Sequence, residues 1–324
     1  MTVPKTLRTL RNIILRLLYG AVSLLFIIFI TFIADEMVPG DAATILAGDK
    51  ATEAQVIRLR KAMGLDRAWP VRFVEYVGEI SHGDFGKSYR APYEPVVDIV
   101  KRDLPMTAKI AGCAILLASA IGLVLGTFAA LNENRATDRV ALSLSTLGVT
   151  LPNFVLAPLL VLVFVEWLDY LPLRWQVPEL QVAPQIYYLI LPVVVMAARP
   201  VAMLTRLTRA SMLDTLQQEF VRLGIAKGVP AFRLYLVHAL RNAILPVLTG
   251  IGTSFGYLLT GSFIVERFFL LPGLGREAIE AIQQRNTPVI MACVIVTGAM
   301  FIVINLVVDI VQQLVDPRIR ESQI

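Results

Sequence analysis

The sequence predicts an all-α membrane protein with six transmembrane helices, because of its composition and the placement of its apolar residues. Of 324 residues, 56% are hydrophobic and only 17% are charged, whereas about a quarter of the residues in an average soluble domain are charged. At a rise of ~1.5 Å per residue, each long apolar run crosses ~30 Å of hydrocarbon. The predicted spans are residues 13–34, 106–131, 139–168, 186–207, 243–265 and 289–311.

The first span follows a short basic tail that contains Lys5, Arg8, Arg11 and Arg16. This order of charge and hydrophobicity resembles a secretory signal peptide. The apolar run from Leu17 to Ala34 is too long for a signal-peptide core, however, and no small-x-small cleavage site follows it. We therefore expect a retained transmembrane helix.

Positive charges predict the orientation of the spans. With six spans, the N-terminal tail, the segment 199–241 and the C-terminal tail with Arg318 and Arg320 all fall on one side. The segment 199–241 holds seven Lys or Arg residues against two acidic residues. The positive-inside rule places this side, with both termini, in the cytoplasm. The formal net charge of +5 then reflects loops that face anionic lipid and does not indicate binding to nucleic acid.

Residues 35–104 form a loop long enough to fold into a small cap on the outer surface. Thr52 and Gln55 fit a capping box at the start of a helix, and Gly64 marks the end of that helix. Pro70 begins a second amphipathic segment that ends near Gly83. We predict two helices in this loop.

Prolines interrupt two of the predicted spans. Pro152 and Pro158 are expected to break the third span, and the Arg199-Pro200 step weakens the end of the fourth. Irregular backbone at membrane depth must be buried in protein or line a cavity. Pro152 and Asn153 are therefore candidates for lining a polar pathway, with packing as the alternative.

Small residues recur every fourth position in two spans and allow helix backbones to approach closely. The second span carries Ala118, Gly122, Gly126 and Ala130, and the fifth carries Gly252, Gly256 and Thr260. Packing within the chain is the simpler interpretation. Contact with a homologous second subunit is the alternative.

A short motif, Gly83-Asp84-Phe85-Gly86-Lys87-Ser88, ends like a phosphate-binding loop. The complete pattern needs a glycine five residues before Gly86, and that position is Ser81. No apolar strand precedes it, and it lies in the predicted outer loop. We therefore expect this chain to bind no nucleotide.

Other residue types give little indication of catalysis or metal binding. The two histidines, His82 and His238, do not have metal-ligand spacing, and Cys113 and Cys293 both lie in apolar runs, where a disulfide is not expected. Asn305 and Asp309 are polar residues near the end of the last span. A helix-end role is favoured for Asp309 over proton coupling.

The basic segment 219–246 is predicted to form two short helices between apolar runs. The step from Gly228 to Pro230 breaks any continuous helix. Apolar residues keep a spacing of three to four positions, which is typical of an amphipathic helix. They are Ile225, Val229, Phe232, Tyr235 and Leu236.

This segment resembles the cytoplasmic "EAA" loop of permeases of ATP-binding-cassette (ABC) importers, in which Glu-Ala-Ala is followed by three residues and a glycine. Gly228 matches that glycine, whereas Arg222-Leu223-Gly224 replaces Glu-Ala-Ala. The run Arg-x-x-x-Ala-Lys-Gly, followed by His238 to Ala243 and Leu245-Pro246, is similar to the peptide-importer branch.

Further stretches in the same order resemble the first permease subunit of oligopeptide or dipeptide importers, so that the resemblance covers nearly the whole chain. They are Val38 to Asp41, Leu59 to Asp66, His82 to Ser88, Leu104 to Thr107, Leu271 to Gly275 and Val315 to Arg320.

The resemblance implies the type I ABC importer permease architecture, in the bacterial inner membrane. It implies a homologous second permease, two cytoplasmic ATPases that use ATP and Mg²⁺, and an extracytoplasmic solute-binding protein. This chain itself would bind no cofactor and would be no enzyme. The family's coupling helix falls on about 222–233, and the residues carried over are Arg222, Ala226, Lys227, Gly228, Phe232 and Arg233.

The expected organisation follows from the spans and the resemblance. Residues 1–34 form the tail and first span, 35–104 the outer loop, 105–315 a five-helix core with a coupling loop at about 208–242, and 316–324 a cytoplasmic tail. A permease of the same architecture for nickel, glycosides or opines remains an alternative. So does a stand-alone secondary transporter or channel, although neither an inverted repeat nor deep acidic residues are visible. An intramembrane enzyme lacks a catalytic constellation.

Overall fold

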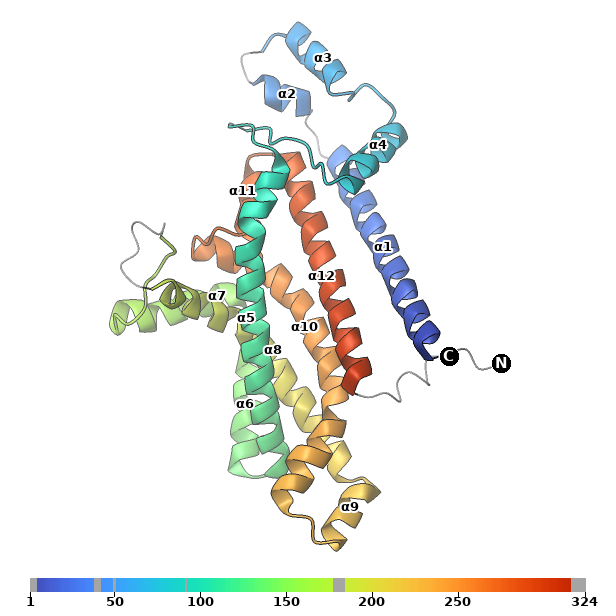
Figure 1. The fold of residues 1–324 in the computed structure, drawn as a ribbon. Coiled ribbons are helices and arrows are strands. Elements are labelled where there is room, and N and C mark those ends of the chain that lie inside the picture. Colours follow the sequence, from blue (N-terminus) through green and yellow to red (C-terminus); the bar gives the residue numbers. More distant parts are fainter. Residues whose placement is uncertain (1–4, 38–41, 49–50, 91, 177–183, 316–324) are drawn as a thin grey trace. The chain divides into compact units, whose positions relative to one another are not determined.

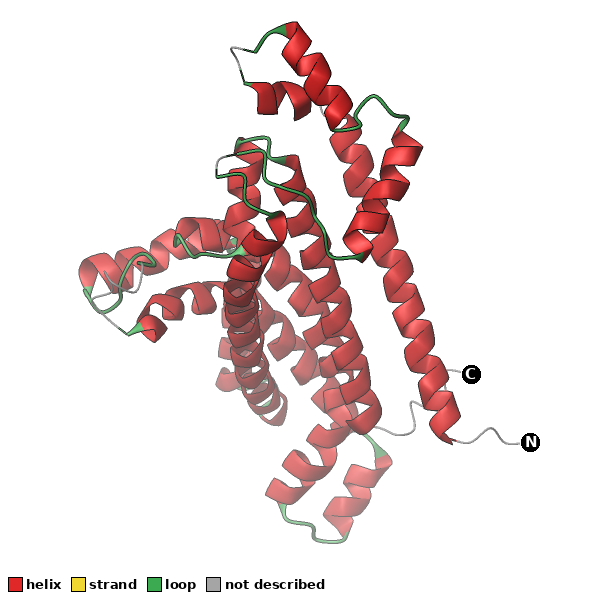
Figure 2. Ribbon diagram, turned by 45° about the horizontal axis from the view of Figure 1, so that its top comes forward, coloured by secondary structure: helices red, strands yellow, loops and turns green. Residues whose placement is uncertain are grey.

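The computed structural model describes residues 5–37, 42–48, 51–90, 92–176 and 184–315. These residues form helices joined by loops (Figure 2). One isolated β-bridge connects Lys87 and Pro95. The helices are α1 (Lys5–Met37), α2 (Ala42–Ala47), α3 (Glu53–Ala62), α4 (Trp69–Ser81), α5 (Val96–Leu131), α6 (Ala136–Thr150), α7 (Asn153–Val161), α8 (Gln185–Leu216), α9 (Glu219–Ala226), α10 (Leu240–Phe268), α11 (Leu274–Gln283) and α12 (Thr287–Val315), with π-helical segments η1 (Leu162–Trp167) and η3 (Arg233–Ala239).

Five helices are long and apolar enough to cross a membrane. They are Ile14–Met37 within α1, α5, α8, the continuous stretch Arg233–Phe268, and Thr287–Gln312 within α12. A sixth span requires that α6 be counted together with α7 and η1, two pieces bent by 107° at their junction. The all-α membrane fold is therefore confirmed, and the prediction of six spans holds when this bent pair counts as one.

The bend lies at Leu151–Pro152, where both residues have extended backbone, with ψ values of 116° and 149°. This confirms the interruption predicted at Pro152. The prediction for Pro158 is wrong, because α7 continues through it as a helix. A proline in a helix loses one hydrogen bond and crowds the preceding turn, but neighbouring contacts can hold the helix together.

Several helices extend beyond the apolar runs that predicted them. α5 begins at Val96, so its first turns lie in the range assigned to the outer loop, and α8 continues through Pro192 and Pro200 to Leu216. The expected weak end at Arg199-Pro200 is therefore wrong, because α8 is helical through both residues. Hydropathy detects only the apolar part of a helix, whereas the polar turns beyond it are helical too.

The loop after α1 contains the two predicted helices, α3 and α4, preceded by the short α2. The capping box forms as expected: the Thr52 N–H donates to Gln55 Oε1 over 2.9 Å. Gly64 and Gly83, at the two predicted stops, have φ values of +67° and +80°. A left-handed backbone of this kind favours glycine.

The chain forms two compact units, which are described separately. The first comprises the described residues of Met1–Thr107 and Pro272–Ile302. Here α4 packs on α1, with the Phe73 ring 5.4 Å from the rings of both Phe29 and Phe32. An ion pair between Arg72 Nη1 and Glu36 Oε2, 2.9 Å apart, joins the same two helices. Aromatic edge contacts of this kind stabilise a packed pair beyond the burial of area alone.

The second unit comprises the described residues of Ala108–Leu271 and Val303–Ile324, with α8 at its centre. α8 contacts α6, α7, α10 and η3. Glycines permit two of its close approaches. A Cβ added at Gly126 on α5 would lie 2.5 Å from the Thr208 Cβ, and one at Gly148 on α6 would lie 2.9 Å from the Ala198 carbonyl oxygen. Both distances are below ordinary van der Waals contact, so these helices pack backbone to backbone.

Candidate functional site

The α9–η3 hairpin, residues Glu219–Ala239, follows α8 at one end of the second unit (Figure 1). α9 begins after Gln218, and Glu219 in its first turn interacts favourably with the helix dipole. It ends at Ala226, and Gly228 has a φ of +70°. The Gly228 N–H donates to the Ile225 carbonyl over 2.9 Å, and the Val229 N–H donates to the Gly224 carbonyl over 3.0 Å. These bonds close the helix end and reverse the chain.

The second arm begins directly after the turn. The Leu234 N–H donates to the Pro230 carbonyl over 3.0 Å, and the helix then continues through η3 into α10. Val221 on α9 and Leu234 on η3 are buried. A Cβ at Gly224 would lie 2.6 Å from Leu234 Cδ1. The hairpin therefore has a closely packed interior of its own.

The outer surface of the hairpin is apolar and basic. Leu223, Ile225 and Phe232 are 58%, 59% and 74% exposed. Basic residues Arg222, Lys227 and Arg233 are exposed around them. An exposed apolar surface with a polar rim is typical of a protein-binding site.

The coupling residues carried over from the resemblance all lie on this exposed surface: Arg222, Ala226, Lys227, Gly228, Phe232 and Arg233. They do not form one helix, as the expected range 222–233 implied. The range covers the second half of α9, the turn, and the start of the next helix. The break at Gly228–Pro230, predicted from sequence, explains why.

The pathway and packing candidates lie in the second unit. Pro152 is exposed at the bend, and Asn153 is half-buried beside α10, where a Cβ at Gly261 would lie 2.8 Å from Asn153 Nδ2. A Cβ at Gly122 on α5 would lie 2.7 Å from the Leu204 Cβ on α8. Asn153 and Gly122 therefore lie at contacts between helices of this chain.

The two glycine candidates on α10 have different surroundings. Gly252 is buried against the last part of α12, where a Cβ would lie 3.2 Å from Asn305 Oδ1. Gly256 is half-buried, and its carbonyl accepts a hydrogen bond from Thr260 Oγ1 over 3.2 Å. Gly252 thus serves packing within the chain.

A buried ion pair was missed by sequence reasoning. Arg209 on α8 donates from Nε to Asp138 Oδ1 over 2.5 Å and from Nη2 to Asp138 Oδ2 over 2.8 Å. The Asn134 N–H donates to the same carboxylate over 2.9 Å, and Asp138 is only 2% exposed. The pair fixes the start of α6 to α8. Its members lie 71 residues apart, so no local pattern joins them.

The motif that resembled a phosphate-binding loop lies in the first unit. The Ser88 N–H donates to the Glu94 carbonyl, and the buried Asn286 donates from Nδ2 to Ser88 Oγ over 2.8 Å. Asn286 Oδ1 also accepts from the Tyr89 N–H over 3.0 Å. A phosphate-binding loop needs free backbone N–H groups at a helix N-terminus, whereas this segment leads into the bridge between Lys87 and Pro95. Its contacts are those of a structural loop.

A charged cluster in the first unit surrounds Arg102. This side chain pairs with Asp103 Oδ1 over 3.0 Å, Glu94 over 3.2 Å and, at 3.8 Å, with Glu277 on α11. Burial raises the pKa of Glu277 above its ordinary value, and the nearby charge of Asp103 raises it further. Within the described ranges, no group of three His, Cys, Asp or Glu side chains is arranged to hold a metal ion.

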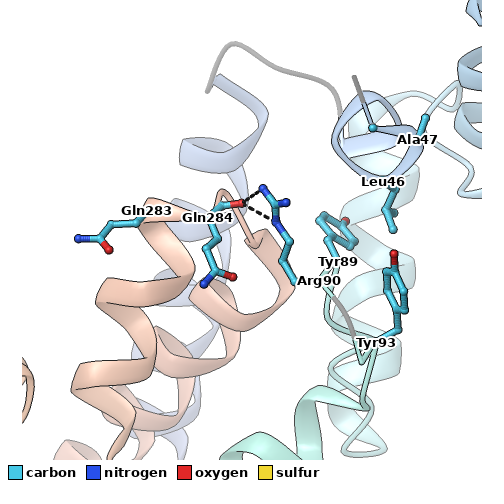
Figure 3. Close-up of a pocket in the computed structure, with 8 residues that line it drawn as sticks. Leu46, Ala47, Tyr89, Arg90, Tyr93, Gln283 and Gln284 are labelled. Carbon is cyan, nitrogen blue, oxygen red and sulfur yellow. Dashed lines mark hydrogen bonds between the residues drawn. The ribbon is translucent and has the colours of Figure 1, made fainter. Parts of the chain in front are cut away.

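Figure 3 shows an open recess in the first unit, between the end of α2, the loop before α5 and the end of α11. Arg90 points across it and donates from Nη2 to the Gln284 carbonyl over 3.1 Å. Tyr89 and Tyr93 line the opposite part, with Leu46 and Ala47. At this recess, Arg90 thus links the loop before α5 to the end of α11.

Comparison with known proteins identifies the family. Residues 122–321 match the family described as binding-protein-dependent transport system inner membrane component, and residues 9–111 match the N-terminal part of such membrane components. The dipeptide transport system permease protein DppB of Bacillus subtilis is 36% identical over 311 residues, which cover 96% of this chain and 98% of DppB.

A second relative gives the same result. The glutathione transport system permease protein GsiC of Salmonella choleraesuis is 36% identical over 315 residues, which cover 95% of this chain and 99% of GsiC. Full-length similarity to two permeases agrees with the membrane-spanning helices of the structure. The chain therefore belongs to the family of binding-protein-dependent transport system inner membrane components, the multi-pass permease subunits of ABC importers.

Proposed function

We propose that this permease subunit imports peptides and that the α9–η3 hairpin couples it to a separate ATPase subunit. The observation that carries the coupling is the exposed apolar surface of Leu223, Ile225 and Phe232 on a hairpin with a packed interior. Such a surface suits a groove on another protein. Because the two arms are packed together, the hairpin moves as one body and passes its displacement to α8 and α10.

The proposed assembly has four kinds of subunit. This chain and a homologous second permease form the pathway, two ATP-binding subunits dock in the cytoplasm, and a solute-binding protein delivers cargo from the opposite side. ATP and Mg²⁺ belong to the ATP-binding subunits, so this chain is a non-catalytic transport subunit. The basic hairpin and both termini are assigned to the cytoplasm. ATP binding favours one orientation of the pathway, and hydrolysis restores the other.

The relatives favour a peptide cargo over nickel, a glycoside or an opine. DppB is named for dipeptide transport and GsiC for glutathione transport, and each aligns with more than nine-tenths of this chain. Membership in a binding-protein-dependent family also weighs against a stand-alone secondary transporter or channel.

Phe232→Ala tests the coupling. The assembled importer is reconstituted in lipid vesicles, and ATP-dependent peptide uptake is measured together with retention of the ATPase on the membrane subunits. An exposed aromatic anchor at a protein interface is worth ~2 kcal/mol or more, so we expect uptake and ATPase retention to fall more than about tenfold, while membrane insertion is unchanged. Gly228→Asp, in the left-handed turn, should give the same uncoupling.

Phe26→Ala is the matched control. Phe26 on α1 is 62% exposed but lies outside the hairpin, so its removal should leave ATPase retention intact. Normal uptake with both Phe232→Ala and Gly228→Asp would refute the coupling role of the hairpin.

A further inference from the structure

Arg199 lies within the membrane-crossing part of α8. Every 18-residue stretch of this 32-residue helix contains Arg199, and 18 residues of helix span only ~27 Å. The side chain is nevertheless exposed on the surface of the chain. A permanent positive charge at membrane depth is costly and marks a functional position unless a partner is present.

The guanidinium carbon of Arg199 lies 4.7 Å from the centre of the Tyr257 ring on α10. This is a cation–π contact. Among the residues that the structure describes, no carboxylate lies within ion-pairing distance of Arg199. The ring therefore fixes the position of the guanidinium while leaving its N–H donors available for hydrogen bonds.

Tyr257 belongs to a polar face of α10 that is exposed in this chain. The face comprises Thr249, Thr253, Tyr257 and Thr260, which follow one another at helical spacing of four, four and three residues. Thr253 donates to the Thr249 carbonyl over 3.1 Å, and Thr260 donates to the Gly256 carbonyl over 3.2 Å. The Thr253 and Thr260 hydroxyls thus retain acceptor capacity, whereas the Thr249 hydroxyl accepts a hydrogen bond from Gln312 Nε2 on α12 over 2.8 Å.

The exposed face of α5 in the same unit is different. It presents Leu116, Val124 and Phe128, which are 72%, 53% and 57% exposed and are suited to contact with lipid. Hydrocarbon disfavours hydroxyl and guanidinium groups, which face a bundle interior or a watery cavity instead. The face of Arg199 and α10 is therefore suited to a polar pathway.

We propose that Arg199, held over Tyr257, is a specificity-determining residue of the translocation pathway that binds a carboxylate of the cargo. Guanidinium donors match a carboxylate in a bidentate manner, and the low dielectric of the span strengthens the attraction. The neighbouring hydroxyls are suited to the peptide groups of the same cargo. This inference rests on the proposed import of peptides and adds the chemical group that the permease recognises.

The test uses the complete importer in lipid vesicles, with binding protein loaded to saturation so that rate differences arise in the membrane subunits. The probes are trialanine, its C-terminal amide, and Ala-Glu-Ala amide, each first shown to bind the binding protein. Arg199→Gln should lower kcat for trialanine about tenfold, leave the KM for loaded binding protein unchanged, and leave uptake of trialanine amide unchanged. Arg199→Lys, which keeps the charge, should recover most of the rate.

The probes distinguish the two sources of a carboxylate. A loss with trialanine alone assigns Arg199 to the C-terminal carboxylate, whereas a loss with Ala-Glu-Ala amide assigns it to acidic side chains. An equal loss for all three peptides, or no loss, overturns the inference. Tyr257→Leu removes the ring but no charge, and it should reduce the difference in uptake rate between trialanine and trialanine amide. It serves as a second test if the importer with Arg199→Gln does not assemble.

Two controls keep the inference separate from the proposed function. Arg206→Gln removes an exposed positive charge two turns further along α8 and should affect the acid and the amide equally. If the unmodified importer carries no peptide at all, the proposed function fails. If it carries peptides and Arg199→Gln behaves like the unmodified chain, only the assignment of Arg199 fails.

Discussion

Asp138 and Arg209 show how one side-chain pair can hold a helix end in place. The carboxylate accepts two bonds from the guanidinium and one from the Asn134 N–H. The side chains are 3% and 19% exposed. A buried pair is not a large net source of stability, but the loss of one partner leaves a charge without compensation.

Asp138→Asn is therefore expected to destabilise the protein by about 3 kcal/mol, because Arg209 then keeps its charge without a counter-ion. The measurement is the midpoint of thermal unfolding of the purified complex. Glu219→Gln is the control, since its pair with Arg222 has side chains 83% and 70% exposed and exposed pairs contribute ~0–1 kcal/mol. Equal midpoints for the two variants would contradict a structural role for the buried pair.

At the residue scale, the sequence predicted positions with a local signature. Gly64, Gly83 and Gly228 were identified as helix stops, and all three have positive φ. The Asp138–Arg209 pair had no such signature, because distant contacts leave no periodic pattern. Arg199 was counted both in the predicted span 186–207 and in the basic segment 199–241, because hydropathy did not show that α8 continues past it.

Among the helices, the packing of α5 on α8 depends on Gly126. An added Cβ would lie 2.5 Å from the Thr208 Cβ and 2.6 Å from the Thr205 carbonyl oxygen. A clash with backbone is relieved only by moving one of the two helices.

Gly126→Ala should therefore lower the thermal midpoint despite the better helix propensity of alanine, which favours the helix by ~1 kcal/mol. Gly112→Ala on the same helix is the matched control, because a Cβ there meets nothing within 4 Å. Its midpoint should be unchanged or higher. If Gly126→Ala is as stable as Gly112→Ala, the close approach of α5 and α8 is not required.

Helix existence was easier to predict than helix ends. Long apolar runs located α1, α5, α8, α10 and α12, because a span must be continuously apolar. The ends were placed up to ten residues away from the observed ones at α5 and η3. Hydropathy has no information on polar helical turns. Helices continue through Pro158, Pro192 and Pro200, as proline is tolerated in helices of a membrane bundle.

For the whole molecule, the orientation in the membrane is open to a direct test. Single cysteines are introduced at Arg222 in α9 and at Arg58 in α3, both exposed, after Cys113 and Cys293 have been replaced by alanine. A membrane-impermeant maleimide should label position 58 in intact spheroplasts and position 222 only in inverted vesicles, because the positive-inside rule places the basic hairpin in the cytoplasm. Labelling of both positions from the same side would contradict the proposed topology.

The overall class of the molecule could be predicted from composition and order of motifs, and family membership confirmed it. The functional surfaces were only partly predictable. The hairpin carried a recognisable motif around Gly228. The polar face of Thr253, Tyr257 and Thr260 could not be predicted, because the structure is needed to show which side of α10 is buried and which is exposed.

The continuity of α8 has a mechanical consequence. α9 follows its end, and Arg199 lies near its middle beside Pro200. Since proline has no N–H, the Met196 carbonyl loses its usual helical donor, and the helix bends more easily at Pro200, as it does at Pro192, than at its other residues. A displacement of the hairpin is therefore expected to bend α8 at Pro200, next to the guanidinium of Arg199. Such a bend changes the direction of the Arg199 side chain, so that binding and release of an anionic cargo follow the movement of the hairpin.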